Sequence, residues 1–291
     1  MPATWTVLAS GSSGNASFLE CGGAGILVDI GLGPRQLARR LEAIGSAWEA
    51  VRGVLLTHTH ADHWSARSLA QLAERRIPFF CHSEHLRPMH LQSKSFQALQ
   101  FAGLVRTYVP GRDFSTLKGT RCRALTLKHD GGATFGFRIE ADQSAAGSSW
   151  AVGYAADLGS WEATLPTALA NVDVLALEFN HDVEMQRSSG RAGWLINRVL
   201  GEFGHLSNTQ GATLLEECAI QSRAGRLRYV VQLHLSRECN RPALAVAAAR
   251  RVIAQHNLQV DLHTASQDVP SATIDLADDR ESVPHVGALA G

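Results

Sequence analysis

The sequence is poor in cysteine, has no excess of either charge and lacks a long hydrophobic run. Its five cysteines are scattered over 291 residues and form no C-x-x-C pair, which argues against a disulfide framework and a thiolate zinc site. Lys plus Arg and Asp plus Glu both number 27, so overall charge favours neither a nucleic-acid binder nor an enzyme for acidic substrates. No apolar segment reaches transmembrane length, and the amino-terminal MPATWTVLAS lacks the features of a signal peptide. These absences predict a soluble cytoplasmic protein that does not bind membranes, and they leave its oligomeric state open.

What the sequence does contain is two strand-rich halves, each followed by helical segments. Short β-like runs separated by glycine-containing turns fill the first third, and further runs fill about 104–155. Apolar residues at helical spacing predict helices at 34–45, 65–76, 192–203, 208–220 and 241–256. We therefore predict an α/β fold, an αββα sandwich of two mixed β-sheets flanked by helices.

The organisation along the chain predicts one domain and a tail. Neither an internal repeat nor a long linker interrupts 1–265, which we assign to a single domain. DQSAAGSS, at 142–149, is polar and predicts a hairpin loop. From about Ser266 the chain becomes polar, so we expect 266–291 to form a poorly ordered tail.

A cluster of histidines follows an apolar run in VLLTHTHADHW, residues 54–64. His58 and His60 are two positions apart, so in an extended segment their side chains point the same way. Asp62 and His63 follow at the start of the next predicted helix, where the chain has turned. Imidazole and carboxylate groups together suit Zn²⁺, Mn²⁺ or iron. A solvated polar loop would not require this spacing, so the cluster predicts a metal site.

Three further polar residues end other β-like runs. His129 follows RALTLK, Asp157 follows SWAVGYAA, and His234 lies near the end of RYVVQLHLS. Each of them alone is more often an ordinary surface or core residue. Jointly they are typical of the second half of a dinuclear site, in which an aspartate is well suited to bridge two cations.

The H-x-H-x-D-H cluster and these three residues together resemble the metallo-β-lactamase superfamily. The resemblance implies two sets of ligands bridged by Asp157: His58, His60 and His129 for one divalent ion, and Asp62, His63 and His234 for the other. It further implies that Asp29, in GILVDIG, orients a ligating histidine, although a simple turn residue fits this position equally well. The implied ions are zinc or manganese. Iron is less favoured, because di-iron redox or gas-binding members typically carry glutamate at the position of His60.

Several motifs resemble one bacterial branch of this superfamily, the YycJ-like or WalJ-like proteins. They are LASGSSGNASFLE, AADLG, EFNHD, GHLSN and HLSRECN, and the resemblance runs from about Leu8 to Ala265. Members of the branch are regarded as DNA exonucleases acting from the 5′ end with manganese or zinc. The resemblance thus implies a phosphodiesterase that degrades DNA in the 5′-to-3′ direction through a metal-bridging hydroxide, with DNA as its partner.

Catalytic roles are predicted for four residues. Two cations about 3.5–4 Å apart can activate a shared water and clamp the attacking and leaving oxygens of a phosphodiester, and we count Asp62 among the catalytic residues as well as the ligands. His205, in GHLSN, is the candidate proton donor to the leaving alkoxide; a capping or surface residue is the alternative. His181 and Asp182 are expected to orient one another near the metals, unless they form only a loop hydrogen bond.

Substrate contacts are predicted at two turns. The SGSSGN turn, with Ser12, Ser13 and Asn15, could hold a phosphate on its backbone amides, or be an ordinary tight turn. Ser207 is a predicted N-cap, and with Asn208 it begins a helix whose positive end would attract a phosphate.

Two other hydrolytic functions stay open. The same dinuclear site serves ester, thioester or lactone hydrolysis of small molecules. An RNA-processing nuclease is also possible, although the large inserted domain of the RNA-cleaving β-CASP group is absent, because Asp157 and His234 are only 77 positions apart (234 − 157).

Overall fold

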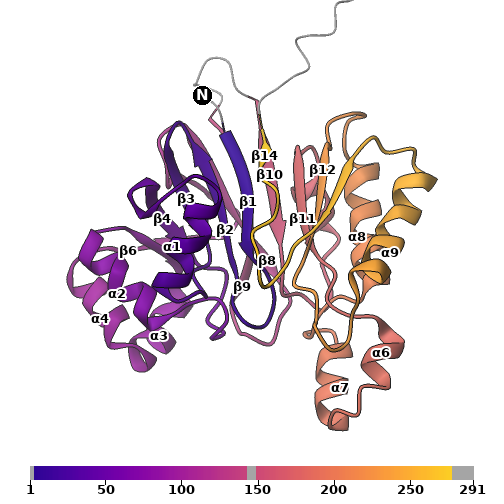
Figure 1. Cartoon of the computed structure of the whole chain (residues 1–291), viewed down its shortest axis with the longest axis horizontal. Helices are drawn as coiled ribbons and strands as arrows, with labels where there is room; N and C mark the ends of the chain where they lie inside the picture. Colours follow the sequence, from indigo (N-terminus) through magenta and orange to yellow (C-terminus); the bar gives the residue numbers. More distant parts are fainter. Residues whose placement is uncertain (1–2, 143–148, 277–291) are drawn as a thin grey trace, which may run out of the picture.

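The computed structural model describes residues 3–142 and 149–276, which form two seven-stranded sheets packed face to face (Figure 1). The first sheet has the order β14-β1-β2-β3-β4-β5-β6 and consists of β1 (Ala3–Ala9), β2 (Ala16–Cys21), β3 (Ala24–Val28), β4 (Val51–Leu55), β5 (Phe79–His82), β6 (Val105–Tyr108) and β14 (Ile274–Asp275). Strands β1 to β3 pair antiparallel, whereas β3 to β6 pair parallel. The sheet is therefore mixed.

The second sheet has the order β13-β12-β11-β10-β9-β8-β7. It consists of β7 (Asp113–Phe114), β8 (Thr120–Leu127), β9 (Thr134–Ala141), β10 (Ala151–Ala155), β11 (Val174–Glu178), β12 (Tyr229–Leu233) and β13 (Asp261–Thr264). Strands β10 to β13 run parallel, and β7 to β10 pair antiparallel, so this sheet is mixed too.

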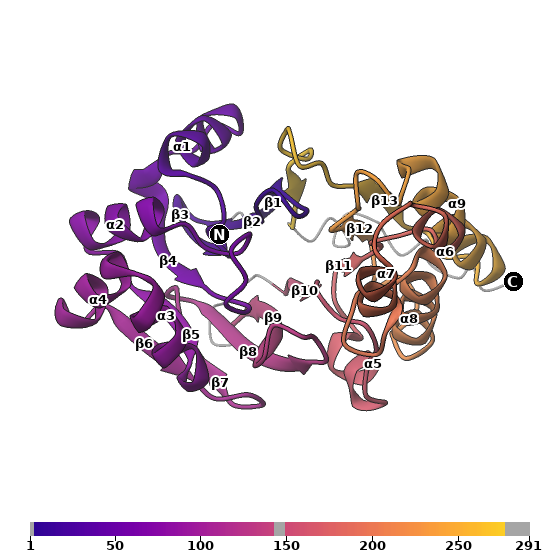
Figure 2. The same ribbon diagram turned by 90° about the horizontal axis from the view of Figure 1, so that it is seen from below.

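Helices cover the outer faces of both sheets (Figures 1 and 2). The first sheet carries α1 (Pro34–Ala43), α2 (Ala66–Arg75), α3 (Leu86–Gln92) and α4 (Lys94–Phe101), with short 3₁₀ turns at Trp48–Ala50 and Ser83–His85. The second sheet carries α5 (Thr164–Leu169), α8 (Asn208–Ile220) and α9 (Pro242–Gln255). Two more helices, α6 (Val183–Arg187) and α7 (Gly193–Leu200), lie at the lower edge of the second sheet. The predicted αββα sandwich is confirmed.

The buried residues form three clusters, one between the sheets and one under the helices on each outer face, because successive side chains of a strand point to opposite faces of its sheet. In β3, Ile26 and Val28 face the interior between the sheets, whereas Leu27 packs against the helices on the outer face. Across the interior, the rings of Trp5 and Tyr154 meet edge to face with their centroids 6.2 Å apart. Each sheet is thus buried on both faces, which fits the nearly continuous apolar runs of its central strands.

The five predicted helices are found within a few residues of their expected ends, but other regions differ from the sequence-based expectation. The sequence analysis predicts none of the four shorter helices α3, α4, α5 and α6. Residues 266–276, expected to be poorly ordered, instead lie along β1: Ile274 pairs with Trp5, and Ile274 and Leu276 are buried. Alternation of these two apolar residues with polar ones lets the segment cover the edge of β1. Residues 277–291 and most of the expected loop at 142–149 lie outside the described residues.

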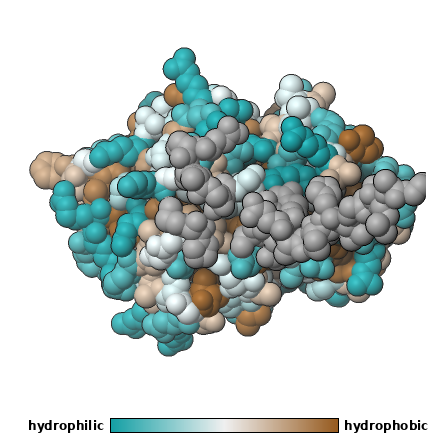
Figure 3. All heavy atoms as spheres, turned by 90° about the horizontal axis from the view of Figure 1, so that it is seen from above, coloured by the Kyte–Doolittle hydropathy of each residue, from teal (hydrophilic) through white to brown (hydrophobic). Residues whose placement is uncertain are grey.

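The upper surface of the molecule lies opposite the ends of β4, β8, β10 and β12. On its described part, hydrophobic side chains are scattered among hydrophilic ones (Figure 3). Within residues 3–142 and 149–276, no helix is long and apolar enough to cross a membrane.

Candidate metal centre

The lower edge of the sandwich brings the seven predicted ligands together. Strands β4, β8, β10 and β12 all end at this edge (Figure 1), and polar residues follow each of them. They are His58 and His60 after β4, Asp62 and His63 in the following turn, His129 after β8, Asp157 after β10 and His234 after β12. These side chains form overlapping groups, and within each group the ligand atoms lie within 4.8 Å of one another.

Left-handed backbone turns the chain at three of the strand ends. The φ angles of Asp29, Asp157 and His234 are 63°, 62° and 56°. Non-glycine residues rarely adopt this region, and they cluster at functional sites where the surrounding structure holds them. Here, the backbone amide of His234 donates a hydrogen bond to Ser10 Oγ at 2.8 Å, which helps to fix the turn.

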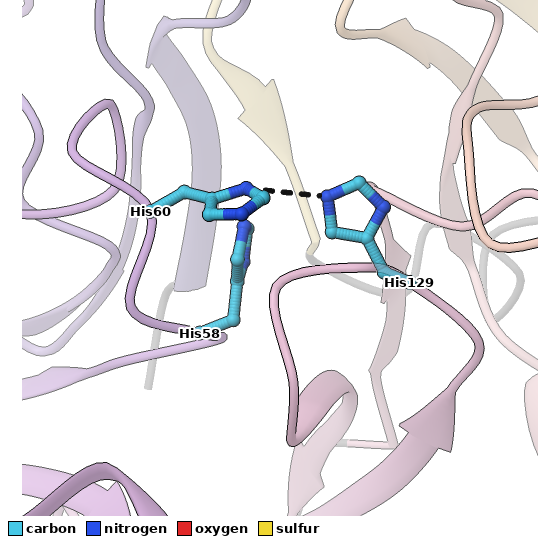
Figure 4. Close-up of side chains that lie close together, drawn as sticks. All are labelled: His58, His60 and His129. Atoms are coloured by element: carbon cyan, nitrogen blue, oxygen red, sulfur yellow. Dashed lines mark hydrogen bonds between the residues drawn. The ribbon is translucent and has the colours of Figure 1, made fainter. Parts of the chain in front are cut away.

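The first group consists of His58, His60 and His129, whose rings face one another across the gap between the sheets (Figure 4). His129 Nε2 lies 3.3 Å from His60 Nδ1. His129 Nδ1 is 2.9 Å from the carbonyl oxygen of Gly204, which leaves Nε2 to face the gap. His58 Nδ1 is likewise held by Thr57 Oγ1, at 3.0 Å. One ring nitrogen of each of these two histidines is therefore fixed from behind and the other faces the group.

The second group consists of Asp62, His63 and His234. Asp62 Oδ2 lies 3.6 Å from His63 Nε2 and 3.4 Å from His234 Nε2. The opposite nitrogen of His234, Nδ1, is 3.1 Å from the side-chain nitrogen of Asn180. The carboxylate and both imidazoles thus converge on one point.

Asp157 lies between the two groups. Its Oδ2 is 3.1 Å from His63 Nε2, and its Oδ1 is 3.3 Å from His234 Nε2. It also shares a possible ligand group with His58, a member of the first group. This central position is the one that a bridging carboxylate would need.

Burial and neighbouring charges shift the pKa values of the histidines in the centre in opposite directions. Burial and the neighbouring His63 hold the pKa of His58 well below its usual range. Burial also acts to lower the pKa of His63, but Asp29 and Asp157 outweigh it and raise this pKa well above its usual range. At His234, Asp157 and Asp62 outweigh burial and raise the pKa to about 9. The carboxylates therefore favour positive charge here, which a proton or a metal cation can supply.

The donor set fits divalent cations. Nε2 of His58 is buried and has no hydrogen-bond partner among the described residues, a costly arrangement unless a ligand satisfies it. Imidazole and carboxylate donors suit zinc and manganese. His58, His60 and His129 could hold one ion, and Asp62, His63 and His234 another, with Asp157 between them.

Asp29 lies behind the second group, as the resemblance implied. Its carboxylate is fully buried, and Oδ2 is 2.7 Å from His63 Nδ1. Oδ1 accepts hydrogen bonds from the backbone amide and the hydroxyl of Thr57, at 2.9 and 3.0 Å. Asp29 is thus placed to orient His63 without facing the gap itself.

His205 lies at the rim of the centre, and a partner that sequence reasoning missed holds it there. Its ring stacks on that of His234, with centroids 5.2 Å apart. His205 Nδ1 is 2.7 Å from Oε1 of Glu178, a fully buried carboxylate at the end of β11. Burial would lower the pKa of His205, but Glu178 and Asp157 outweigh it and raise the pKa. Glu178 falls within the EFNHD motif, and its place at the end of an apolar strand was the signal that could have found it.

The expected pairing of His181 with Asp182 is not present. Asp182 caps α6 instead, because its Oδ1 accepts a hydrogen bond from the backbone amide of Met185. His181 is buried, and neither of its ring nitrogens has a hydrogen-bond partner among the described residues. Burial lowers the pKa of His181 to about 4, so its ring is neutral at pH 7. Because the Asp182 carboxylate accepts this hydrogen bond at the start of α6, it does not hydrogen-bond to the ring of His181.

In the SGSSGN turn, the side chains of the two adjacent serines are exposed at the surface and the asparagine side chain is buried at the metal centre. Ser12 and Ser13 are exposed, and Ser12 lines a pocket beside the centre. Asn15 is buried, and its side-chain nitrogen lies 3.0 Å from His63 Nε2 and 3.2 Å from Asp62 Oδ2. Its Oδ1 accepts a hydrogen bond from the amide of Gly11. Asn15 therefore contacts two predicted ligands and holds the turn closed.

Ser207 and Asn208 are placed at the start of α8, as predicted, but both are buried. Ser207 forms a capping box with Gln210, in which its hydroxyl accepts a hydrogen bond from the Gln210 amide. Asn208 exchanges side-chain hydrogen bonds of 2.9 Å with Asn240. Their observed contacts stabilise the helix start and its packing, and a direct substrate contact stays a prediction.

Comparison with known proteins places the chain among metallo-hydrolases. Residues 25–229 match the family model described as the beta-lactamase superfamily domain. The chain is 29% identical over 264 residues to Exodeoxyribonuclease WalJ of Streptococcus pneumoniae, with 88% of this chain and 90% of the relative covered. It is 23% identical over 278 residues to Exodeoxyribonuclease YycJ of Bacillus anthracis, with coverage of 92% and 97%.

The fold is also found among solved structures. The metallo-beta-lactamase fold protein YhfI of Bacillus subtilis superposes with a TM-score of 0.64 at 16% sequence identity. The superposition covers 94% of this chain and all of YhfI. At this identity the likeness concerns the fold alone, and it agrees with the sandwich described above.

Proposed function

We propose that this chain, which belongs to the β-lactamase superfamily, is a metal-dependent nuclease that removes nucleotides from the 5′ end of DNA. The observation that carries the proposal is the position of Asp157 between two groups of imidazole and carboxylate ligands. The similarity to two exodeoxyribonucleases over about nine-tenths of the chain supports DNA as the substrate.

We propose zinc or manganese as the metals. Two such ions, when bound, lower the pKa of water and neutralise the charge of a phosphodiester. The two histidine groups would hold them, and Asp157 would contact both. The cytoplasm, where DNA is present, is the proposed location.

Protein side chains would position and protonate the substrate. Because Glu178 holds Nδ1 of His205, Nε2 is the nitrogen that can face a substrate. A protonated His205 at the rim can donate a proton to the oxygen that leaves when the phosphodiester bond breaks. Asp29, Thr57 and Asn180 fix the rings of the ligating histidines, so that little rearrangement is needed when DNA binds.

A cleavage assay with labelled ends tests the proposal. The full chain, loaded with manganese or zinc, is incubated with single- and double-stranded DNA and RNA carrying a label at either end. Stepwise loss of nucleotides from the 5′ end of DNA is the expected result. An Asp62→Ala/His63→Ala variant should be inactive, whereas His256→Ala, at the C-cap of α9, should retain activity.

Each alternative function has its own outcome in this assay. Cleavage of RNA but not DNA would favour an RNA-processing nuclease. Intact DNA and RNA, together with turnover of a small ester, thioester or lactone that is lost in the double variant, would reject the nuclease and leave a small-molecule hydrolase.

A further inference from the structure

A pocket of about 150 Å³ lies beside the metal centre, between the ends of the strands and helix α7. His205 and Asp130 are among its lining residues, and Asp130 Oδ1 lies 3.5 Å from Nε2 of the predicted ligand His129. Leu195 and Val199, both on α7, contribute an apolar part of the lining. A molecule bound at the metals could therefore extend directly into this pocket.

Two arginines line the same pocket and are held in place by acids. Nε and Nη2 of Arg191 donate to Glu238 Oε2, at 2.9 and 2.6 Å. Arg198 donates to both carboxylate oxygens of Asp130 through Nε and Nη2. In each guanidinium, Nη1 has no hydrogen-bond partner within the described parts of the chain. These nitrogens are therefore oriented in advance and can donate to a phosphate.

Two exposed aromatic side chains are near these arginines along the chain. Trp194 is 69% exposed and precedes Arg198 by four residues on α7, so the two are neighbours on the helix surface. Phe203 is 53% exposed, and its carbonyl oxygen accepts a hydrogen bond from the Asp130 amide at 2.9 Å. Seen from below, α7 lies at the end of the sandwich that carries the strand ends (Figure 2). Arg191, Trp194, Arg198 and Phe203 are called the α7 wall below.

Aromatic faces beside phosphate-binding cations are typical of proteins that bind single-stranded nucleic acid. Bases stack on the aromatic rings, and the backbone follows the positive charges. In a duplex the faces of the bases are already stacked on one another, so they are not available to such a surface. The combination on the α7 wall therefore distinguishes an unstacked strand from a duplex. The available Nη1 donors of its arginines, each already paired with an acid through its other nitrogens, favour a ligand that carries phosphate oxygens over an apolar protein partner.

We propose that the α7 wall binds an unpaired end of the DNA strand next to the bond that is cleaved. Trp194 and Phe203 stack on bases, and Arg191 and Arg198 bind the phosphate between them. The inference rests on the proposed nuclease function and adds the form of the substrate: a single-stranded or frayed end in preference to a blunt duplex.

Binding can be measured separately from cleavage by using a hydrolysis-resistant substrate. Fluorescence anisotropy with the manganese-loaded full chain compares a labelled phosphorothioate single strand with the same sequence as a blunt duplex. We expect the single strand to bind the wild-type protein more tightly. Trp194→Ala and Phe203→Ala should each weaken single-strand binding about tenfold, since stacking on one aromatic contributes about 1–3 kcal/mol, and should reduce the preference over the duplex. Arg198→Gln should weaken binding and lower its salt dependence.

Matched controls carry the same substitutions elsewhere. Phe101→Ala changes a side chain that is 97% exposed on α4, and Arg251→Gln changes an exposed arginine on α9. Both should bind as the wild type does. Thermal unfolding of each variant verifies that it is folded.

The possible outcomes separate this inference from the proposed function. Wild-type binding by the Trp194→Ala and Phe203→Ala variants, or equal affinity of wild type for duplex and single strand, would overturn the α7 wall even if DNA is cleaved. A wild-type protein that leaves DNA intact but loses single-strand binding in these variants would reject the nuclease and retain the wall. A change of oligomeric state in the variants, with DNA binding intact, would assign the surface to a second copy of the chain and overturn the inference.

Discussion

Nδ1 of His63 lies 2.7 Å from Oδ2 of Asp29, and both side chains are fully buried. Thr57 extends this contact, because its hydroxyl lies 3.0 Å from the Asp29 carboxylate and 3.0 Å from Nδ1 of His58. His58 and His63 belong to different ligand groups. One buried carboxylate therefore orients a predicted ligand of each metal, one directly and the other through a threonine.

Replacement of Asp29 should weaken metal binding at both sites. In the Asp29→Ala variant, His63 and Thr57 lose their common acceptor, and metal affinity should fall about 10- to 100-fold, as is typical when such a partner is lost. Competition with a chromophoric chelator measures the affinity. Asp261→Ala, at an exposed position on β13, serves as the control, and equal metal affinity in both variants would contradict the orienting role.

Glu178 should matter for turnover because it holds His205. Loss of a proton donor typically lowers the rate by about 10²–10⁴-fold, so His205→Ala should lower kcat by at least about 100-fold at saturating metal. Glu178→Gln keeps the shape of the side chain but removes its charge, and it should lower kcat by a smaller factor with little change in KM. Steady-state kinetics on labelled DNA measures both.

The matched control for Glu178→Gln is Glu42→Gln, at an exposed position on α1. The control should keep the kcat of the wild type. A Glu178→Gln variant with unchanged kcat, or with a raised KM alone, would show that Glu178 does not act through His205 in turnover.

Gly31 should be required for the turn that carries Asp62. A Cβ atom at position 31 would lie 1.9 Å from the carbonyl oxygen of Asp62 and 2.8 Å from the amide nitrogen of Asn15. Gly31→Ala should therefore displace this turn, lower the free energy of unfolding by about 1–3 kcal/mol, and reduce the metal content. Thermal unfolding and elemental analysis measure the two effects.

Gly33 offers a close comparison two residues away. A Cβ atom there would have no atom within 4 Å other than those of its own residue and its two chain neighbours. Gly33→Ala should consequently retain wild-type metal content and nearly wild-type stability. If the two variants behave alike, the contact between Gly31 and Asp62 is not what fixes the turn.

His85 should make the stability of the protein sensitive to mild acid. Burial lowers the pKa of His85 to about 4, and its hydrogen bond to the carbonyl of Ala133 opposes this only in part. The unfolded chain binds the proton near pH 6.5. The stabilisation is thus fully present above about pH 6.5 and is lost as the pH falls toward 4, by about 2 kcal/mol between pH 7 and 5.

Urea unfolding of the wild type and of His85→Gln at these two pH values isolates this contribution, because the other histidines are common to both proteins. The free energy of unfolding should fall less in the variant than in the wild type between pH 7 and 5. Parallel pH dependences in the two proteins would contradict a neutral, buried His85.

The sequence alone determined the layered fold and the spacing of the histidine cluster. Apolar periodicity of two and of 3.6 residues is a local property, so it can be read along the chain. The cluster from His58 to His63 is also local, since strand and turn geometry alone directs its side chains. The ligands that lie far from this cluster in the sequence have weaker sequence signals. Taken singly, His129, Asp157 and His234 are ordinary strand-end residues, and the family resemblance is what groups them.

Only the tertiary structure decided which residues meet across the sheets. Glu178 and His205 are 27 positions apart and their contact depends on the packing of α8 against β11, which no local pattern encodes. The turn of Asp182 toward α6 and the covering of β1 by residues 266–276 were likewise decided by competition for buried hydrogen bonds and apolar surface. Such contacts are set by the balance of burial and hydrogen bonding over the whole molecule. A local sequence pattern describes one residue of a contact and does not identify its distant partner.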